Sequence, residues 1–263
     1  MGRIDTAFDA LRAGKGRGLI TYVTAGDPDA DTSVRILVEL ARAGADVLEV
    51  GVPFSDPLAD GPVIQRATER ALAGGMTLKG TLDVVRRVRA EVDTPIVLFT
   101  YANPVVRMAA SVFARAAADA GADGVLILDY PIEEAGPLRA PLLDAGLDPI
   151  FLISPTTSDQ RIRRAGELGR GFLYVISRLG VTGARDQLPT DVEGLVARVR
   201  AQSSLPVALG FGISRPEHVA AVCRSADAAV VGSALVSVIA DHGGSPDVAA
   251  RAGTYVRWLK GAP

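Results

Sequence analysis

Short runs of nearly continuous apolar residues recur along the chain, and stretches with helical periodicity lie between them. Within these stretches apolar residues fall at i, i+3, i+4 and i+7, which places them on one face of a helix. The runs are rich in Val, Ile and Leu, as is typical of parallel strands buried on both faces. The pattern predicts eight strands, over residues 19–24, 47–50, 96–101, 124–128, 149–153, 172–176, 207–210 and 228–231.

The connections that lead from a helix into a strand repeat one motif. ARAGADVLEV (41–50), ADAGADGVLIL (118–128) and LDAGLDPIFLI (143–153) each pass through Ala-Gly and an Asp into an apolar run, and CRSADAAVV (223–231) does the same with Ser-Ala. Glycine is favoured just past a helix end because it adopts positive φ without a Cβ clash. The repetition predicts successive βα units, with Asp31, Asp159 and Asp191 as helix N-caps.

The number of units decides the fold class. Eight alternating units, with an extra helix over residues 4–13 and a last helix over residues 246–260, predict an α/β protein with a (β/α)₈ TIM barrel. A doubly wound open sheet is the alternative, but it usually has fewer strands. No Pro/Ser-rich linker divides the chain, so a single domain over residues 1–263 is expected. The barrel places the active site at the C-terminal ends of its strands.

Composition narrows the classes of function. Apolar residues make up 48% and charged residues 22%, with a net charge of −2, so neither a nucleic-acid partner nor a membrane partner is expected. No apolar run approaches the ~20 residues of a helix that crosses a bilayer. The one cysteine, Cys223, fits a reducing compartment. Since the first residues also lack the apolar centre of a secretory signal, a cytoplasmic protein is predicted.

A carboxylate interrupts the second predicted strand near its C-terminal end. Glu49 shares a face of that strand with Val47, and if this face is inward the carboxylate stands in the barrel mouth. Partial removal from water would raise its pKa and suit it to proton transfer near neutrality. An outward carboxylate paired with an arginine is the alternative. Asp56 and Asp60 follow in a proline-rich loop, either as turn residues or as acceptors for a ligand N–H or hydroxyl.

A second group of residues has the character of a phosphate site. Gly183, Gly212, Gly232 and Ser233 follow the sixth, seventh and eighth predicted strands. In this fold phosphate is frequently held by the loops after strands seven and eight and by a helix N-terminus. Glycine lets the backbone approach the anion, and the N–H groups at a helix start point toward it. Plain tight turns are the alternative reading.

Several common kinds of chemistry find no support. The chain has three lysines, Lys15, Lys79 and Lys260, and none falls at a strand end, where an imine-forming lysine would be expected. His218 and His242 fall in helical patterns, His218 on an outer face and His242 at a helix end, so no metal site is predicted.

Acid–base chemistry by carboxylates on a phosphorylated small molecule remains, without a metal or a cofactor in this chain. Tyrosines on the first, third and sixth predicted strands could take part. Core packing with a satisfied hydroxyl is the alternative for each of them. They are Tyr22, Tyr101 and Tyr174.

Seven motifs, in order along nearly the whole chain, resemble the α subunit family of tryptophan synthase. The fifteen-residue segment LEVGVPFSDPLADGP is the most specific of them. The motifs are TYVTAGDP (21–28), LEVGVPFSDPLADGP (48–62), FTYANPV (99–105), DGVLILDYP (123–131), ISRLGVTGAR (176–185), GFGIS (210–214) and GSA (232–234).

The resemblance implies a (β/α)₈ lyase that cleaves indole-3-glycerol phosphate reversibly to indole and glyceraldehyde 3-phosphate. It puts the family's catalytic glutamate at Glu49 and its catalytic aspartate at Asp60. Glu49 would move protons at indole C3 and the glycerol hydroxyl, while Asp60 would accept the indole N–H. The implied substrate-binding residues are Gly183, Gly212, Gly232 and Ser233 for phosphate, Tyr174 and the loop residue Thr182, and Phe99, Leu126 and Phe211 in the indole pocket, with Tyr22 where the family often has phenylalanine.

The resemblance also implies a partner. In this family a pyridoxal-phosphate β subunit receives indole through a tunnel in an α₂β₂ complex, so pyridoxal phosphate belongs to the partner. The loops at 53–62 and 178–191 are expected to act as lids and coupling elements. Two alternatives stay open: a stand-alone indole-3-glycerol-phosphate lyase, and a catalytically silent barrel that serves as an allosteric binding subunit.

Overall fold

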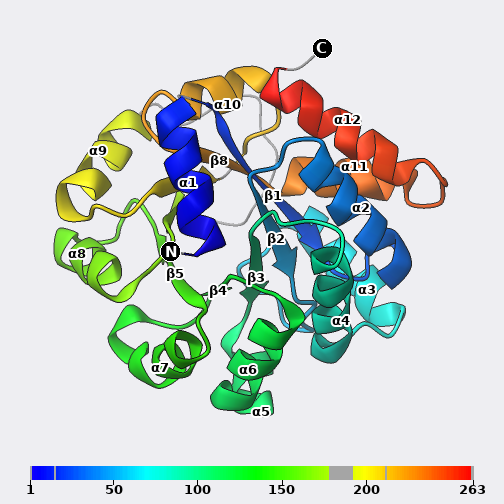
Figure 1. Cartoon of the computed structure of the whole chain (residues 1–263), viewed down its shortest axis with the longest axis horizontal. Helices are drawn as coiled ribbons and strands as arrows, with labels where there is room; N and C mark the ends of the chain where they lie inside the picture. The colour runs from blue at the N-terminus through cyan, green and yellow to red at the C-terminus, as the bar shows by residue number, and fades with distance from the viewer. Residues whose placement is uncertain (1, 15, 178–191, 211, 262–263) are drawn as a thin grey trace.

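The computed structural model describes residues 2–14, 16–177, 192–210 and 212–261. In this part of the chain eight parallel strands close into a barrel in sequence order, with helices around it (Figure 1). The strands are β1 (Gly18–Thr24), β2 (Val47–Gly51), β3 (Ile96–Thr100), β4 (Gly124–Ile127), β5 (Asp148–Ile153), β6 (Leu173–Ile176), β7 (Val207–Gly210) and β8 (Ala228–Val231).

Helices connect the strands and cover the outside of the barrel. Those before β5 are α1 (Arg3–Gly14), α2 (Ala30–Arg42), α3 (Pro62–Ala73), α4 (Leu78–Arg89), α5 (Ala102–Met108), α6 (Ala110–Ala120), the 3₁₀ turn η1 (Ile132–Glu134) and α7 (Gly136–Asp144). Those after β5 are α8 (Asp159–Leu168), α9 (Val192–Gln202), α10 (Pro216–Val222), α11 (Ser233–His242) and α12 (Val248–Lys260).

The predicted strands and the fold class are confirmed. Each predicted strand overlaps an observed one, and no end differs by more than one residue. The glycines of the repeated motif end their helices with positive φ, 100° at Gly44, 93° at Gly121 and 77° at Gly146. A single domain over residues 1–263 stays a prediction.

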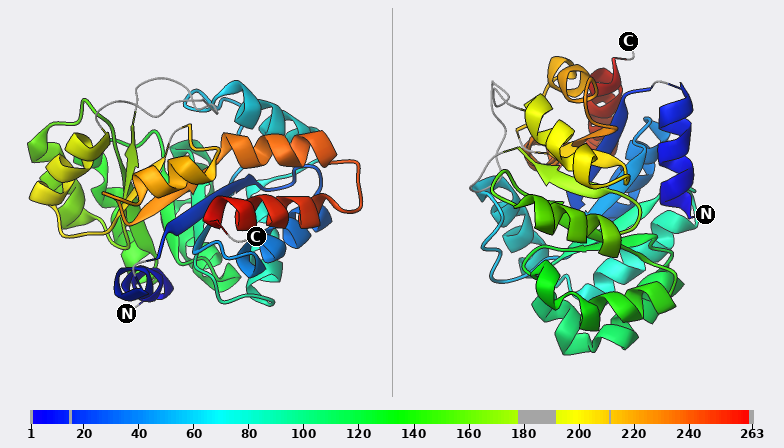
Figure 2. Two further views of the ribbon diagram at one scale, coloured as in Figure 1. Left: turned by 90° about the horizontal axis from the view of Figure 1, so that it is seen from above. Right: turned by 90° about the vertical axis from the view of Figure 1, so that its left-hand side faces the viewer.

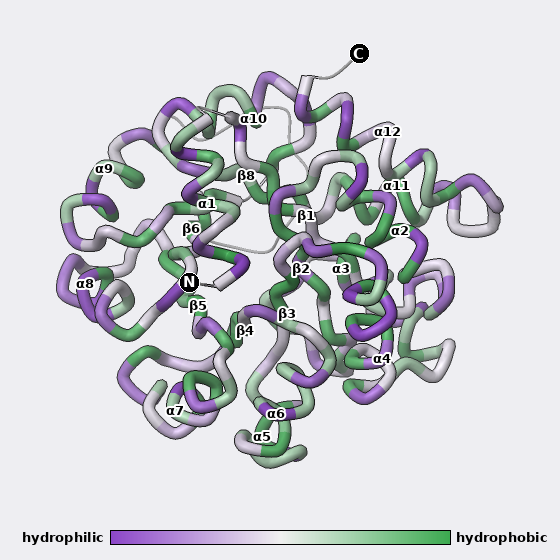
Figure 3. Tube along the Cα trace, in the orientation of Figure 1, coloured by the Kyte–Doolittle hydropathy of each residue, from purple (hydrophilic) through white to green (hydrophobic). Residues whose placement is uncertain are grey.

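The apolar residues of the strands form two layers. Alternate residues point into the barrel or outward against the helices, so in β2 Val47 packs in the interior while Leu48 and Val50 pack outside. Figure 3 shows the hydrophobic strands at the centre of the molecule and alternating colours along the helices around them. Because both faces of the sheet are covered, a polar side chain on a strand is removed from water whichever way it points.

One end of the barrel is closed by α1, which lies across it in Figures 1 and 2. Ile4 and Phe8 on this helix are buried and pack with the interior residues of the strands. The ring of Phe8 lies 5.4 Å from that of Phe172, measured between centroids. This end of the barrel is therefore filled by apolar side chains, and the polar interior positions lie toward the other end.

Two predicted details are wrong. The N-caps of α2 and α8 are Asp29 and Ser158, whose side chains accept from the N–H of Thr32 and Arg161. A cap must precede the first turn, whereas Asp31 and Asp159 lie within it. Asp191 lies outside the described residues.

The position of His218 also differs from the prediction. His218 is buried in α10, with Nδ1 accepting from the N–H of Ser214 at 3.3 Å, so it does not lie on an outer face. This helix has only seven residues, and a short helix gives a weak periodic signal for the side that faces the core. His242 is the last residue of α11, as expected.

Candidate active site

Glu49 points into the barrel and is completely buried. It shares the inward face of β2 with Val47 and lies beside Tyr22 of β1 and Val97 of β3. Neither carboxylate oxygen has a hydrogen-bond partner in the described part of the chain, which disfavours an outward ion pair with an arginine. Burial without compensation raises the pKa of Glu49 to about 8. At neutral pH the side chain is mostly a neutral acid, able to donate a proton.

Asp60 is the second buried acid of the region and has a different environment. It lies in the loop between β2 and α3 and is only 5% exposed. Its burial raises the pKa of the carboxyl to about 6, and a hydrogen bond from Tyr101 acts in the opposite direction. Asp60 is therefore mostly ionised at neutral pH, when Glu49 is mostly protonated. Asp56, in contrast, is exposed and accepts from the hydroxyl of Ser55 at 2.6 Å.

Tyr101 holds Asp60 in place, although the sequence pattern assigns it no defined role. Its hydroxyl donates to Oδ2 of Asp60 at 3.0 Å and accepts from the backbone N–H of Ala59 at 3.1 Å. Its ring lies 5.2 Å from that of Phe54 in the same loop. The predicted strand included Tyr101, but β3 ends one residue earlier and Tyr101 is the N-cap residue before α5. One feature of the sequence could have indicated this role. Tyr101 lies at the end of a predicted strand, and that strand follows the strand of Glu49.

Aromatic side chains from three strands face one another inside the barrel. The ring centroids of Tyr22 and Phe99 lie 5.2 Å apart, edge to face, and those of Phe99 and Tyr174 lie 6.2 Å apart. Leu126, from β4, is fully buried in the same interior cluster. Burial first, and then the charge of Glu49, raise the pKa of Tyr174 far above its usual range. These rings form an apolar wall close to the buried acid, suited to a flat aromatic ligand.

The glycines predicted to bind phosphate lie at adjacent strand ends. Gly212 follows β7 with a φ of 79°, which favours glycine because a Cβ would be strained there. Gly232 caps the N-terminus of α11, and Ser233 is its first residue. The start of this ten-residue helix presents N–H groups and a favourable dipole to an anion. Thr182, Gly183 and Phe211 lie outside the described residues.

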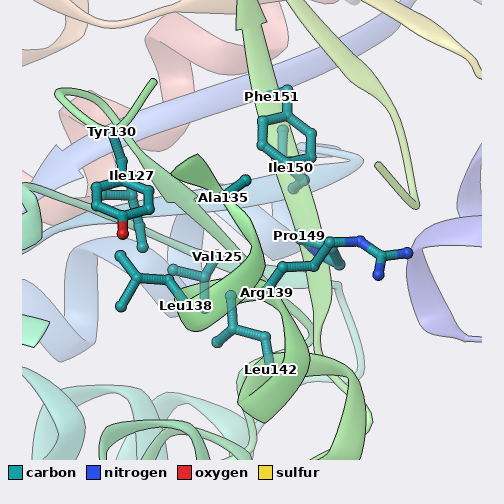
Figure 4. Close-up of a pocket in the computed structure, with 10 residues that line it drawn as sticks. All are labelled: Val125, Ile127, Tyr130, Ala135, Leu138, Arg139, Leu142, Pro149, Ile150 and Phe151. Atoms are coloured by element: carbon teal, nitrogen blue, oxygen red, sulfur yellow. The ribbon is translucent and has the colours of Figure 1, made fainter. Parts of the chain in front are cut away.

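The pocket in Figure 4 lies elsewhere, between α7 and the strands β4 and β5. Its lining is largely apolar, with Arg139 as the one charged side chain. It holds no acid–base pair, so it does not compete with the barrel interior as the reaction site.

A metal site is not visible in the part of the chain that the structure covers. No three His, Cys, Asp or Glu side chains among the described residues are grouped closely enough to hold an ion. The same residues contain no helix long and apolar enough to cross a bilayer.

The family model for the tryptophan synthase alpha chain matches residues 8–260. The chain belongs to the tryptophan synthase alpha chain family. This membership confirms the resemblance drawn from the seven motifs, and it makes the protein a lyase of tryptophan biosynthesis with the barrel predicted for it. The assignments of single site residues stay predictions.

Similar proteins share most of their length with this chain. The tryptophan synthase alpha chain of Burkholderia thailandensis is 48% identical over 263 residues, covering 100% of this chain and 97% of the relative. That of Caulobacter sp. is 52% identical over 238 residues, or 90% and 86% of the two chains.

Solved structures agree with the barrel. Tryptophan synthase subunit alpha of Legionella pneumophila has a TM-score of 0.89 at 38% identity and covers 99% of this chain and 98% of its own. A chain from the structure of Mycobacterium tuberculosis tryptophan synthase has a TM-score of 0.91 at 38% identity and covers 99% and 97%.

Replacing Tyr101 with phenylalanine tests the hydrogen bond that Tyr101 donates to Asp60. The Tyr101→Phe variant loses a hydrogen bond to a charged group, so we expect kcat/KM for indole-3-glycerol phosphate cleavage to fall about tenfold or more. The lost bond stabilises the carboxylate form of Asp60, so without it the pKa of Asp60 should rise. The fall of kcat/KM at low pH, where Asp60 takes up a proton, should then begin at a higher pH.

A matched control for this experiment is Tyr130→Phe. Tyr130 lines the outer pocket of Figure 4, between α7 and the strands β4 and β5, away from the two acids. We expect its pH profile to match that of the unmodified chain. A Tyr101→Phe profile that keeps its acid limb in place would show that the contact with Asp60 is structural only.

Proposed function

We propose that this chain cleaves indole-3-glycerol phosphate reversibly to indole and glyceraldehyde 3-phosphate. The observation that carries the proposal is Glu49, a fully buried acid without a hydrogen-bond partner in the described residues, inside a barrel whose mouth also holds Asp60. Two carboxyl groups in different environments give one proton donor and one anion at the same pH. Acid–base cleavage of a carbon–carbon bond needs such a pair.

Protonated Glu49 would start the reaction. Its proton goes to C3 of the indole, which turns the ring into a leaving group bound through an sp³ carbon. The bond between C3 and the glycerol chain then breaks, and its electrons return to the ring. The hydroxyl on the departing carbon becomes an aldehyde and gives its proton to Glu49, which restores the acid. The neutral starting form of Glu49 follows from its raised pKa.

Asp60 would stabilise the charge that develops on the ring. Protonation at C3 makes the indole nitrogen cationic, so a carboxylate that accepts its N–H lowers the energy of the intermediate. Within the described residues the hydrogen bond from Tyr101 uses Oδ2 of Asp60, which leaves the other oxygen for this contact. Tyr101 also fixes the direction in which Asp60 points, because it is tied to the backbone of Ala59.

The phosphate would bind where β7 and β8 end. Gly232 and Ser233 at the start of α11 offer backbone N–H groups, and Gly212 allows the close approach of the backbone. Gly183, Thr182 and Phe211 are proposed to complete the site from the segments outside the described residues. The aromatic wall would hold the indole, with Tyr22, Phe99, Leu126 and Tyr174 as its described members.

This chain would need no cofactor of its own. Lys79 and Lys260 lie on the helices α4 and α12, and Nζ of Lys260 pairs with Asp46 at 2.7 Å, so neither is placed for an imine in the barrel. Lys15 lies outside the described residues. Pyridoxal phosphate would belong to a β subunit, the partner we propose in an α₂β₂ complex. A cytoplasmic location stays a prediction.

The rate of cleavage should depend on pH in a bell shape. Asp60 acts as an anion, so kcat/KM should fall as pH drops through about 6, where its carboxylate takes up a proton. Glu49 acts as an acid, so kcat/KM should also fall as pH rises through about 8, where its proton is lost. Steady-state cleavage measured from about pH 5 to pH 9 checks both limbs. A flat profile would contradict the division of roles.

Replacing Glu49 with glutamine removes the proton and keeps the size and polarity of the side chain. We expect Glu49→Gln to lower indole release by about a thousandfold, while calorimetry shows substrate binding nearly unchanged. Gly232→Arg is the contrasting variant, because its side chain fills the phosphate space and should weaken binding. Substantial turnover by Glu49→Gln would mean that another group is the acid.

Assays with and without the cognate β subunit distinguish the remaining alternatives. We expect the isolated chain to release indole slowly and the complex to release it faster, because a partner that receives indole couples to the loop at 53–62. Equal rates would favour a stand-alone lyase. Complete inactivity in both assays would instead favour a silent barrel that serves only as an allosteric binding subunit.

A further inference from the structure

The hydroxyl of Tyr22 occupies space that a glycine leaves open. Gly51 ends β2, two residues beyond Glu49 and on the same face. A Cβ on Gly51 would lie 2.2 Å from the phenol oxygen of Tyr22, far inside van der Waals contact. Any other residue at this strand end would displace the ring. The absence of a side chain at Gly51 therefore allows the hydroxyl of Tyr22 to lie at this strand end.

This hydroxyl has little hydrogen bonding for its degree of burial. Tyr22 is 5% exposed, and within the described residues its oxygen meets only Oγ1 of Thr24, at 3.3 Å. A phenol can donate one hydrogen bond and accept others, so capacity remains at the oxygen. A buried polar atom that can make a further hydrogen bond favours a ligand with a hydrogen-bonding group at that place. It disfavours a ligand that puts a methyl group there.

The ring of Tyr22 runs from the phosphate end of the proposed site toward the acids. At one end of the side chain, its Cβ lies 3.6 Å from the position of a Cβ on Gly232. At the other end the hydroxyl lies against Gly51. Burial raises the pKa of this hydroxyl, and the ionised forms of Asp60 and Glu49 add to the effect, which places it near both acids. With its phosphate at Gly232 and its indole near the two acids, as proposed above, a substrate would extend its glycerol chain along this ring. The hydroxyl would then face the aromatic part of the substrate.

We infer that the hydroxyl of Tyr22 determines which substituents on the benzene ring of indole the site accepts. This inference rests on the proposed function. At the ring carbon that faces Tyr22, a hydroxyl substituent gains a hydrogen-bond partner, while a methyl of similar size is pressed against a polar oxygen. Sites that offer a hydrogen bond discriminate strongly against analogues that cannot make it. Tyr22 is thus a specificity-determining residue.

The test uses the reverse reaction of the full chain with glyceraldehyde 3-phosphate. Hydroxyindoles and methylindoles substituted at the same ring carbon are compared, for each of the four benzene-ring positions. At each position we compare kcat/KM for the hydroxyindole with kcat/KM for the methylindole. We expect one position at which the unmodified chain favours the hydroxyindole, and at that position the ratio of the two values should fall about tenfold in Tyr22→Phe. The ratio is taken within each variant, so a change in the rate with unsubstituted indole does not affect the comparison.

Tyr174→Phe is the matched control, because it removes the other phenol hydroxyl of the wall, which lies over Gly210. The ratio at the position sensitive to Tyr22 should survive this change. If Tyr22→Phe turns over indole but keeps every ratio within about twofold, the inference is wrong and the proposed function stands. If the unmodified chain does not condense indole with glyceraldehyde 3-phosphate at all, the proposed function is wrong. The inference about Tyr22 is then wrong as well, because it rests on that function.

Discussion

The burial of one carboxyl group, that of Glu49, is the constraint on which the site depends. A closed barrel covered by helices has no interior surface in contact with water except at its open end, and α1 fills the other end. Glu49 is fully buried inside the barrel, toward its open end, without a hydrogen-bond partner among the described residues. Burying a carboxyl group without a hydrogen bond costs free energy. The large apolar core of the barrel offsets this cost better than a smaller core would. The result is a glutamic acid that keeps its proton at neutral pH.

The second acid, Asp60, has a neighbour that keeps it mostly ionised at neutral pH. Asp60 is nearly as buried, but Tyr101 donates a hydrogen bond to it and thereby favours the charged form. The two carboxyl groups therefore differ in how fully they are buried and in the hydrogen bond that Tyr101, from the end of β3, donates to Asp60. Two glycines at strand ends leave room for tyrosine hydroxyls: Gly51 for that of Tyr22 and Gly210 for that of Tyr174. Small residues at strand ends thus place polar groups among aromatic rings.

Prediction from the sequence succeeded where a local rule has one physical cause. Strand positions followed from apolar runs, because a parallel sheet covered on both faces needs apolar residues throughout. The helix ends at Gly44, Gly121 and Gly146 followed from the freedom of glycine at positive φ. The N-caps at Asp29 and Ser158 were missed because several polar residues stand together before these helices, and only hydrogen-bond geometry selects among them.

The sequence alone predicted the barrel, the resemblance to the family and the two acids as candidates, because each depends on motifs and on periodicity that can be read along the chain. The partnership of Tyr101 with Asp60 required tertiary structure, because it joins residues 41 positions apart. The same holds for the seating of Tyr22 against Gly51 and for the division of protonation between Glu49 and Asp60. Hydrogen bonds, close contacts and loss of water depend on distances in space, and chain closure into a barrel is what sets those distances.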